Sequence, residues 1–235
     1  MRAFSSLAAL MLCGLLVACQ SDPVGQRQVP SRGFELADLA KGDIDMVAEI
    51  HLGQSQEYLR ELARKLYVRN PREWQRGHQA SLERAIHRLF GPRRWERYPQ
   101  LQGHRAAAAI GLAFAEEFDG DRVAAFIEGM RGMMLDAYGG KRRFYLHDSF
   151  DPQKIFYLAR NFEIAFWKLG HDRHPDGRLI LLSNSLEGHG DLSFERLAGK
   201  LIGLQDHMAQ VVAESSNRQI KNVIQGVASA VFFPI

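Results

Sequence analysis

The sequence predicts an all-α or nearly all-α domain, a compact bundle of about seven to nine helices around one central apolar helix. Apolar residues recur at three- and four-residue intervals along most of the chain after residue 34, the period that gives a helix one apolar face. Residues that start and stop helices separate these stretches. The two cysteines, Cys13 and Cys19, both lie near the N-terminus, so the helical region has to be stabilised by its core without disulfides.

Two helices are expected in residues 43–67 and 71–90. The first carries a regular apolar face, although Gly53 is a point where it could divide in two. The second begins with Asn70 as the capping residue, a proline at the first helical position and Glu73 to complete a capping box. A Gly-Pro pair follows residue 90 and predicts its end.

A tight helical hairpin is predicted from residues 105–118 and 122–138, joined by a turn at 119–121 that caps the second helix. Short side chains at four-residue spacing would let the two helices approach closely. These rows are Ala107, Gly111 and Ala115 in the first helix, and Ala125 and Gly129, followed by Met133, in the second.

Residues 153–169 form the most apolar helix and are therefore expected at the centre of the fold. Long amphipathic helices are expected at 193–215 and 217–231. Two short apolar segments, 143–147 and 179–182, are the candidates for a small two-stranded element.

The N-terminus has the pattern of a secretory signal. Arg2 precedes an apolar run that is shorter than the roughly 20 residues of a membrane span. The run ends in Leu16-Val17-Ala18-Cys19, which resembles the lipobox of bacterial lipoproteins: an aliphatic residue, a permitted valine, a small residue and the cysteine. The resemblance implies that the signal, residues 1–18, is removed and that Cys19 carries acyl chains such as palmitate on its sulfur and its amino group. Several acyl chains suffice for stable membrane anchoring.

The same resemblance implies an address. In Gram-negative lipoproteins an Asp after the Cys retains the protein in the inner membrane, whereas Gln20 stands here, which favours the outer membrane and its periplasmic face. Residues 19–33 are rich in Pro, Gly and polar residues and are expected to form a flexible tether, followed by a single helical periplasmic domain over residues 34–235. Loss of Arg2 lowers the net charge from +3 to +2. This near balance and the periplasmic address argue against a nucleic-acid partner.

Arginines and aromatic residues concentrate in residues 69–105, which contain nine Arg and three Glu. Arginine binds phosphate and carboxylate bidentately and stacks on aromatic rings. The segment predicts either a contact surface for an envelope component, such as an acidic protein, a lipid phosphate or a cell-wall carboxylate, or a solvated helix face. Its densest part consists of Arg93, Arg94, Trp95, Arg97 and Tyr98.

Two other functions stay open. The sequence has no Gly-x-Ser-x-Gly, phosphate loop, dinucleotide fingerprint or His-Glu-x-x-His motif. A glycan-directed cell-wall hydrolase would need a carboxylate pair, and the candidates are Glu116, Glu117, Asp119 and Asp121.

A metal-binding protein is the second alternative, because imidazoles on a loop can bind zinc. Its candidates are His171, His174 and His189. The apolar residues 223–235 are either a last core helix or an exposed docking tail. A non-catalytic lipoprotein without a cofactor, binding or scaffolding another envelope component, is the function that we favour.

Overall fold

A computed structural model describes residues 33, 35–91, 98–183 and 192–216. The chain divides into two units, residues 1–39 and 40–235. The short 3-10 helix η1 (Leu36–Ala40) crosses this boundary, and the helical domain belongs to the second unit. The seven α-helices and the absence of a strand in the described ranges confirm the all-α prediction. None of the described helices is long and apolar enough to cross a membrane.

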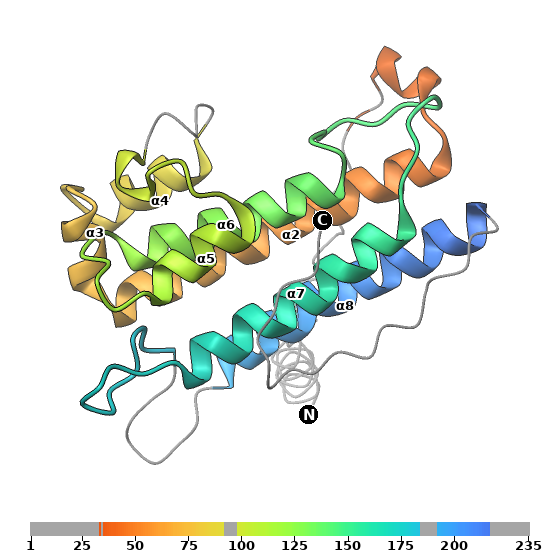
Figure 1. The fold of residues 1–235 in the computed structure, drawn as a ribbon. Coiled ribbons are helices and arrows are strands. Elements are labelled where there is room, and N and C mark those ends of the chain that lie inside the picture. The colour runs from red at the N-terminus through yellow and green to blue at the C-terminus, as the bar shows by residue number, and fades with distance from the viewer. Residues whose placement is uncertain (1–32, 34, 92–97, 184–191, 217–235) are drawn as a thin grey trace, which may run out of the picture. The chain divides into compact units, whose positions relative to one another are not determined.

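The helices of the second unit run in two groups (Figure 1). The α5–α6 hairpin packs on α2 near α3 and α4, while α7 and α8 lie side by side and close the core against α2 and α6. Their bounds are α2 (Asp43–Arg69), α3 (Pro71–Arg76), α4 (Leu82–Phe90), α5 (Ala106–Phe114), α6 (Arg122–Ala137), α7 (Pro152–His171) and α8 (Ser193–Ser216), with a 3-10 turn η3 (Pro99–Leu101) before the hairpin.

The most deeply buried helix is α6, in which 12 of 16 residues are buried, against 9 of 20 in α7. The sequence had pointed to α7, because its apolar residues are more numerous. In α6 the buried set includes the charged Arg122 and Arg131, whose guanidinium groups donate to backbone carbonyls. A count of apolar residues therefore does not reveal how deeply α6 is buried, since two of its buried residues are charged.

The helix expected over residues 71–90 is divided. α3 ends at Arg76, His78 adopts a left-handed φ of 55°, and α4 starts anew after Ser81, whose hydroxyl accepts from the Arg84 amide at 3.2 Å. The capping box predicted for Glu73 does not form with residue 70, because the Glu73 carboxylate accepts from the Arg122 amide at 2.8 Å instead.

The described residues settle two of three further expectations. α2 runs unbroken through Gly53, and the packing of both flanking halves outweighs the roughly 1 kcal/mol that a helical glycine costs. Residues 143–147 and 179–182 do not pair. The only β-bridge in the described part of the chain joins Arg173 to Leu179. The helix expected at 217–231 lies outside the described residues.

The predicted hairpin turn is confirmed, since the Asp121 side chain caps α6 by accepting from the Ala124 amide at 2.8 Å. The close approach occurs at Gly129, where a Cβ would lie 2.5 Å from Cγ1 of Ile110 and 2.8 Å from the carbonyl oxygen of Ala106. Gly111, which we expected in the same contact, is exposed and would meet nothing within 4 Å. The hairpin is therefore tight, but on a different face of α5.

These two glycines make a matched test of the hairpin. Gly129→Ala should lower the free energy of unfolding by about 2–3 kcal/mol, since its methyl group would press on the α5 backbone. Gly111→Ala should raise it by up to about 1 kcal/mol through helix propensity alone. Urea unfolding of both variants measures the difference, and equal effects would contradict this packing.

Candidate functional site

The densest part of the predicted arginine and aromatic segment, residues 93–98, is described only at Tyr98. Arg93, Arg94, Trp95 and Arg97 lie outside the described residues. Tyr98 is buried, and the guanidinium carbon of Arg88 lies 4.5 Å from the centre of its ring. Burial raises the pKa of the Tyr98 hydroxyl well above its usual value. Tyr98 is therefore an anchored end of this segment rather than an exposed contact.

Phe90, the last residue of α4, also contacts arginine side chains. The Phe90 ring has the guanidinium carbon of Arg60 at 4.9 Å and that of Arg131 at 4.7 Å. Cations over aromatic rings attract electrostatically, more strongly where water is excluded. Arg60, Arg88, Arg131, Phe90 and Tyr98 thus form an arginine–aromatic cluster from α2, α4, α6 and the start of η3.

The cluster has a buried base and a more open outer side. Arg131 is 5% exposed and donates to the carbonyl of Leu89 and, at 2.8 Å, to Glu128. Its burial lowers the pKa of the guanidinium from the usual value. Arg60 is exposed and pairs with Glu57 only at 3.4 Å, an exposed contact of little energy. The outer side can therefore accept a carboxylate or phosphate at low cost, whereas Arg131 is structural.

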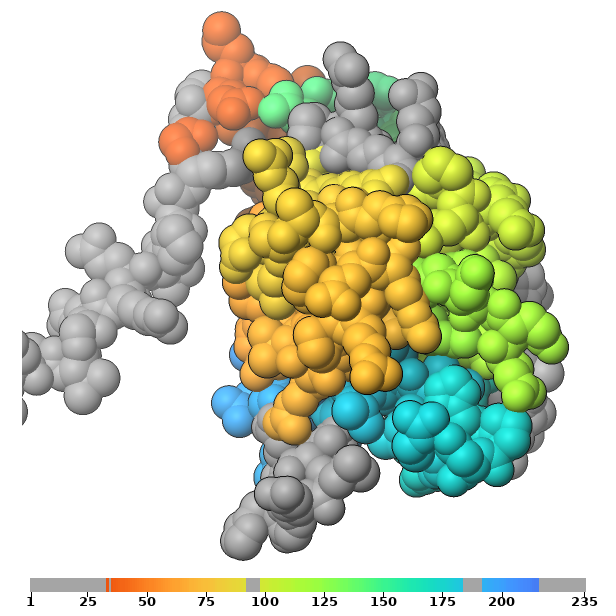
Figure 2. All heavy atoms as spheres, turned by 90° about the vertical axis from the view of Figure 1, so that its left-hand side faces the viewer, coloured from red at the N-terminus to blue at the C-terminus, as the bar shows by residue number. Residues whose placement is uncertain are grey.

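The carboxylates considered for glycan cleavage are not presented on one surface. Glu116, Glu117 and Asp119 are exposed in the hairpin turn, whereas Asp121 is 1% exposed beneath it. Figure 2 looks onto this end of the bundle, where α3 and α4 lie beside the hairpin and the 172–183 loop. The buried Asp121 is therefore not available to a glycan at the surface together with the three exposed carboxylates.

Asp121 belongs instead to a buried polar network at this end of the bundle. The Tyr67 hydroxyl of α2 donates to Oδ2 of Asp121 at 2.8 Å, and the Asp121 amide donates to Oε1 of Gln100 at 3.2 Å. A Cβ at Gly77 would lie 2.6 Å from the same carboxylate, so only glycine allows α3 to end there. The network joins α2, α3, η3 and α6.

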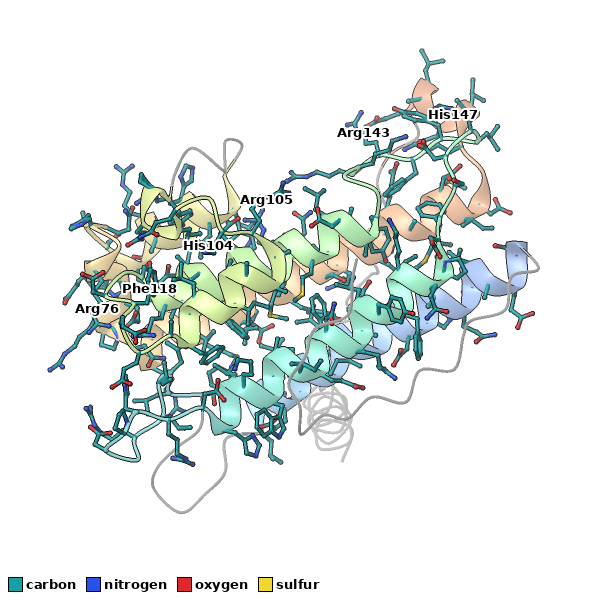
Figure 3. The ribbon with its side chains drawn as sticks, viewed as in Figure 1. Arg76, His104, Arg105, Phe118, Arg143 and His147 are labelled. Atoms are coloured by element: carbon teal, nitrogen blue, oxygen red, sulfur yellow. The ribbon has the colours of Figure 1, made fainter. Side chains whose placement is uncertain are left out.

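Arg122 completes the network on its other side. Its guanidinium donates to the carbonyls of Ala113, Ala115, Glu116 and Phe118 at 2.6–3.2 Å. These carbonyls belong to the last turn of α5 and the chain after it, where helical partners are lacking. Figure 3 shows Phe118 and Arg76 at this end, and Arg76 pairs with Glu73 at 3.0 Å. The guanidinium groups of Arg122 and Arg76 are therefore both paired within the protein, as a structural role requires.

The pKa of Asp121 is raised to about 7, chiefly because burial disfavours the carboxylate. Hydrogen bonds from the Ala124 amide and the Tyr67 hydroxyl stabilise the charged form and offset part of this effect, while the nearby Glu73 adds to it. The sequence predicted the cap at Asp121 but gave no signal of its burial, because its partners lie far along the chain.

The structure describes His171 and His174 of the three loop histidines, and His171 contacts its own helix. His171 lies flat against Trp167, with ring centres 4.6 Å apart, and its Nδ1 contacts the Trp167 carbonyl at 2.8 Å. No group of three or more His, Cys, Asp or Glu residues able to hold a metal occurs within the described ranges. His189 lies outside them, so a site combining it with His171 and His174 stays a prediction.

Comparison of this chain with protein-family models, with curated proteins and with solved structures finds no match in any of the three.

The raised pKa of Asp121 predicts a pH-dependent stability. The folded state keeps a proton up to about pH 7, whereas the unfolded chain releases it near the ordinary value of 3.8. The free energy of unfolding should therefore fall as the pH rises between these values, by up to about 4 kcal/mol. Asp121→Asn keeps an acceptor for the Ala124 amide and cannot ionise, so it should flatten this part of the profile.

Urea unfolding between pH 4 and pH 8 measures this effect. The exposed neighbour Asp119 supplies the control, because Asp119→Asn should leave the slope unchanged. A wild-type slope that persists in Asp121→Asn would show that another group is responsible.

Proposed function

We propose that the chain is an outer-membrane lipoprotein on the periplasmic face, with a non-catalytic role in binding or scaffolding another envelope component. The observation that carries this proposal is the arginine–aromatic cluster. It fixes Phe90 and Tyr98, the two residues that flank the arginine-rich stretch, against the helical domain.

The chemistry of the cluster favours an acidic protein as the partner. In the sequence, Arg93, Arg94 and Arg97 fall between Phe90 and Tyr98, the two rings of the cluster. Planar guanidinium groups bind carboxylates bidentately, and arginine with aromatic residues dominates the energetics of protein interfaces. Phosphates of an envelope lipid present the same charge, and recovery of lipid alone would identify that source.

A lipid anchor makes modest affinity sufficient. Anchoring through Cys19 would confine the domain to a layer beside the membrane, and confinement turns a second contact into an intramolecular event with a high effective concentration. An interface of a few arginines and aromatic rings would then hold a partner that the free domain binds weakly. The glycan-hydrolase and metal-protein alternatives have less support, since Asp121 is buried and the described ranges hold no group of three metal-ligating residues.

The anchor itself is tested by Cys19→Ala. The wild-type protein should sediment with outer membranes, while the variant, lacking acyl chains, should lose this association. Membrane fractionation with immunodetection measures the distribution, and a Cys13→Ala variant controls for loss of a thiol. Unchanged membrane recovery of Cys19→Ala would contradict lipid anchoring at this residue.

The contact surface is tested by replacing Arg93, Arg94 and Arg97 together with Ala. The triple variant should lose its crosslinked partner from intact envelopes, with at least about a tenfold loss of affinity once the partner is purified. The matched control replaces the exposed Arg72, Arg143 and Arg196, which removes the same charge elsewhere. Equal partner recovery from both triple variants would end the proposal.

A further inference from the structure

The contact between α2 and α8 carries a series of polar pairs. Lys200 lies 4.9 Å above the ring of Tyr58, and Nε2 of Gln205 donates to the buried hydroxyl of Ser55 at 2.8 Å. The series reaches the surface at His51 and His207, whose nitrogens Nε2 and Nδ1 are 3.3 Å apart. Along α2 the paired residues run from Tyr58 back to His51, while along α8 their partners run forward from Lys200 to His207. The two helices are therefore antiparallel, and their register brings the two histidines together.

The orientation of the His51 ring is fixed by a backbone carbonyl. Its Nδ1 lies 2.9 Å from the carbonyl oxygen of Val47, which can only accept, so Nδ1 carries the hydrogen. The lone pair of Nε2 is then available on the side that faces His207. Histidine ligands of metals commonly donate their second N–H to a backbone carbonyl in this way.

We propose that His51 and His207 form a two-histidine site for a divalent transition-metal ion, with the chemistry of Zn²⁺, that bridges α2 and α8. Two nitrogens bound tetrahedrally at about 2.0–2.1 Å from zinc are separated by about 3.3–3.4 Å. The separation in the structure is 3.3 Å. The two ring planes are nearly parallel, 12° apart with centres at 5.5 Å, so both rings must rotate to direct their lone pairs at one ion.

The metal-free pair is a simple hydrogen bond, in which His207 Nδ1–H donates to His51 Nε2. On metal binding His207 holds its hydrogen on Nε2 and offers the Nδ1 lone pair, so neither ring changes its net charge. His207 is exposed, which leaves the remaining coordination positions to water. The two ligands are 156 residues apart in the chain, so only the folded protein presents them together.

This inference is independent of the proposed function and has its own test. Zn²⁺ alone is titrated calorimetrically into the full chain in detergent, with Cys13 and Cys19 both replaced by Ala so that free thiols cannot compete. One ion should bind per chain, and His51→Ala or His207→Ala should each weaken the affinity at least tenfold. His87→Ala and His147→Ala, at exposed histidines elsewhere, should leave it unchanged.

Thermal unfolding supplies the second readout. Zn²⁺ should raise the Tm of the parent by several degrees and not that of the two site variants, because binding to the folded state alone stabilises it. Mg²⁺ should have no effect, since imidazole does not suit it. If an Ala variant does not fold, His51→Gln and His207→Gln replace it. Zinc affinity that survives in the site variants, or a parent whose Tm does not respond, would overturn the proposal.

Discussion

The guanidinium of Arg122 is the interaction on which this domain most depends. A buried cation is costly unless its hydrogen bonds are satisfied, and here four carbonyls from the end of α5 and the following turn surround it. These carbonyls would themselves lack a hydrogen-bond donor without Arg122, so the guanidinium and the carbonyls satisfy one another. The preceding residue, Asp121, bonds to α2 and η3, while the Arg122 amide bonds to Glu73 of α3. Two adjacent residues thus fix the entry of α6 relative to three other segments.

The position of α6 in turn determines the arginine–aromatic cluster. Arg131 lies further along the same helix, where its guanidinium reaches the Leu89 carbonyl and the Phe90 ring at the end of α4. A shift of α6 would withdraw Arg131 from both contacts and release one end of the arginine-rich stretch. The surface proposed for partner binding therefore depends on the core, and the buried Arg131 is as necessary to it as the exposed arginines.

Local signals predicted much of the fold, and distant partners account for the failures. The cap at Asp121 depends on neighbouring residues alone, and it occurs where expected. Glu73 fails as a capping residue because a residue 49 positions away, Arg122, takes its carboxylate. The arginine-rich segment is visible in composition alone. The pair of His51 and His207 has no local pattern, since only the antiparallel register of α2 and α8 brings the two rings together.

That register raises the question of what holds antiparallel helices in place when no disulfide is present. Apolar packing alone allows one helix to shift along another. A buried polar side chain is costly without its hydrogen-bond partner, so polar pairs fix the relative position of the helices. Gln205 links Ser55 of α2 to the hydroxyl of Tyr138, which follows α6, so one side chain aligns three segments inside the core. The histidine pair lies at the exposed end of the same contact. A metal ion there would add a crosslink between α2 and α8 that depends on metal supply, in a chain whose two cysteines both lie in the first nineteen residues.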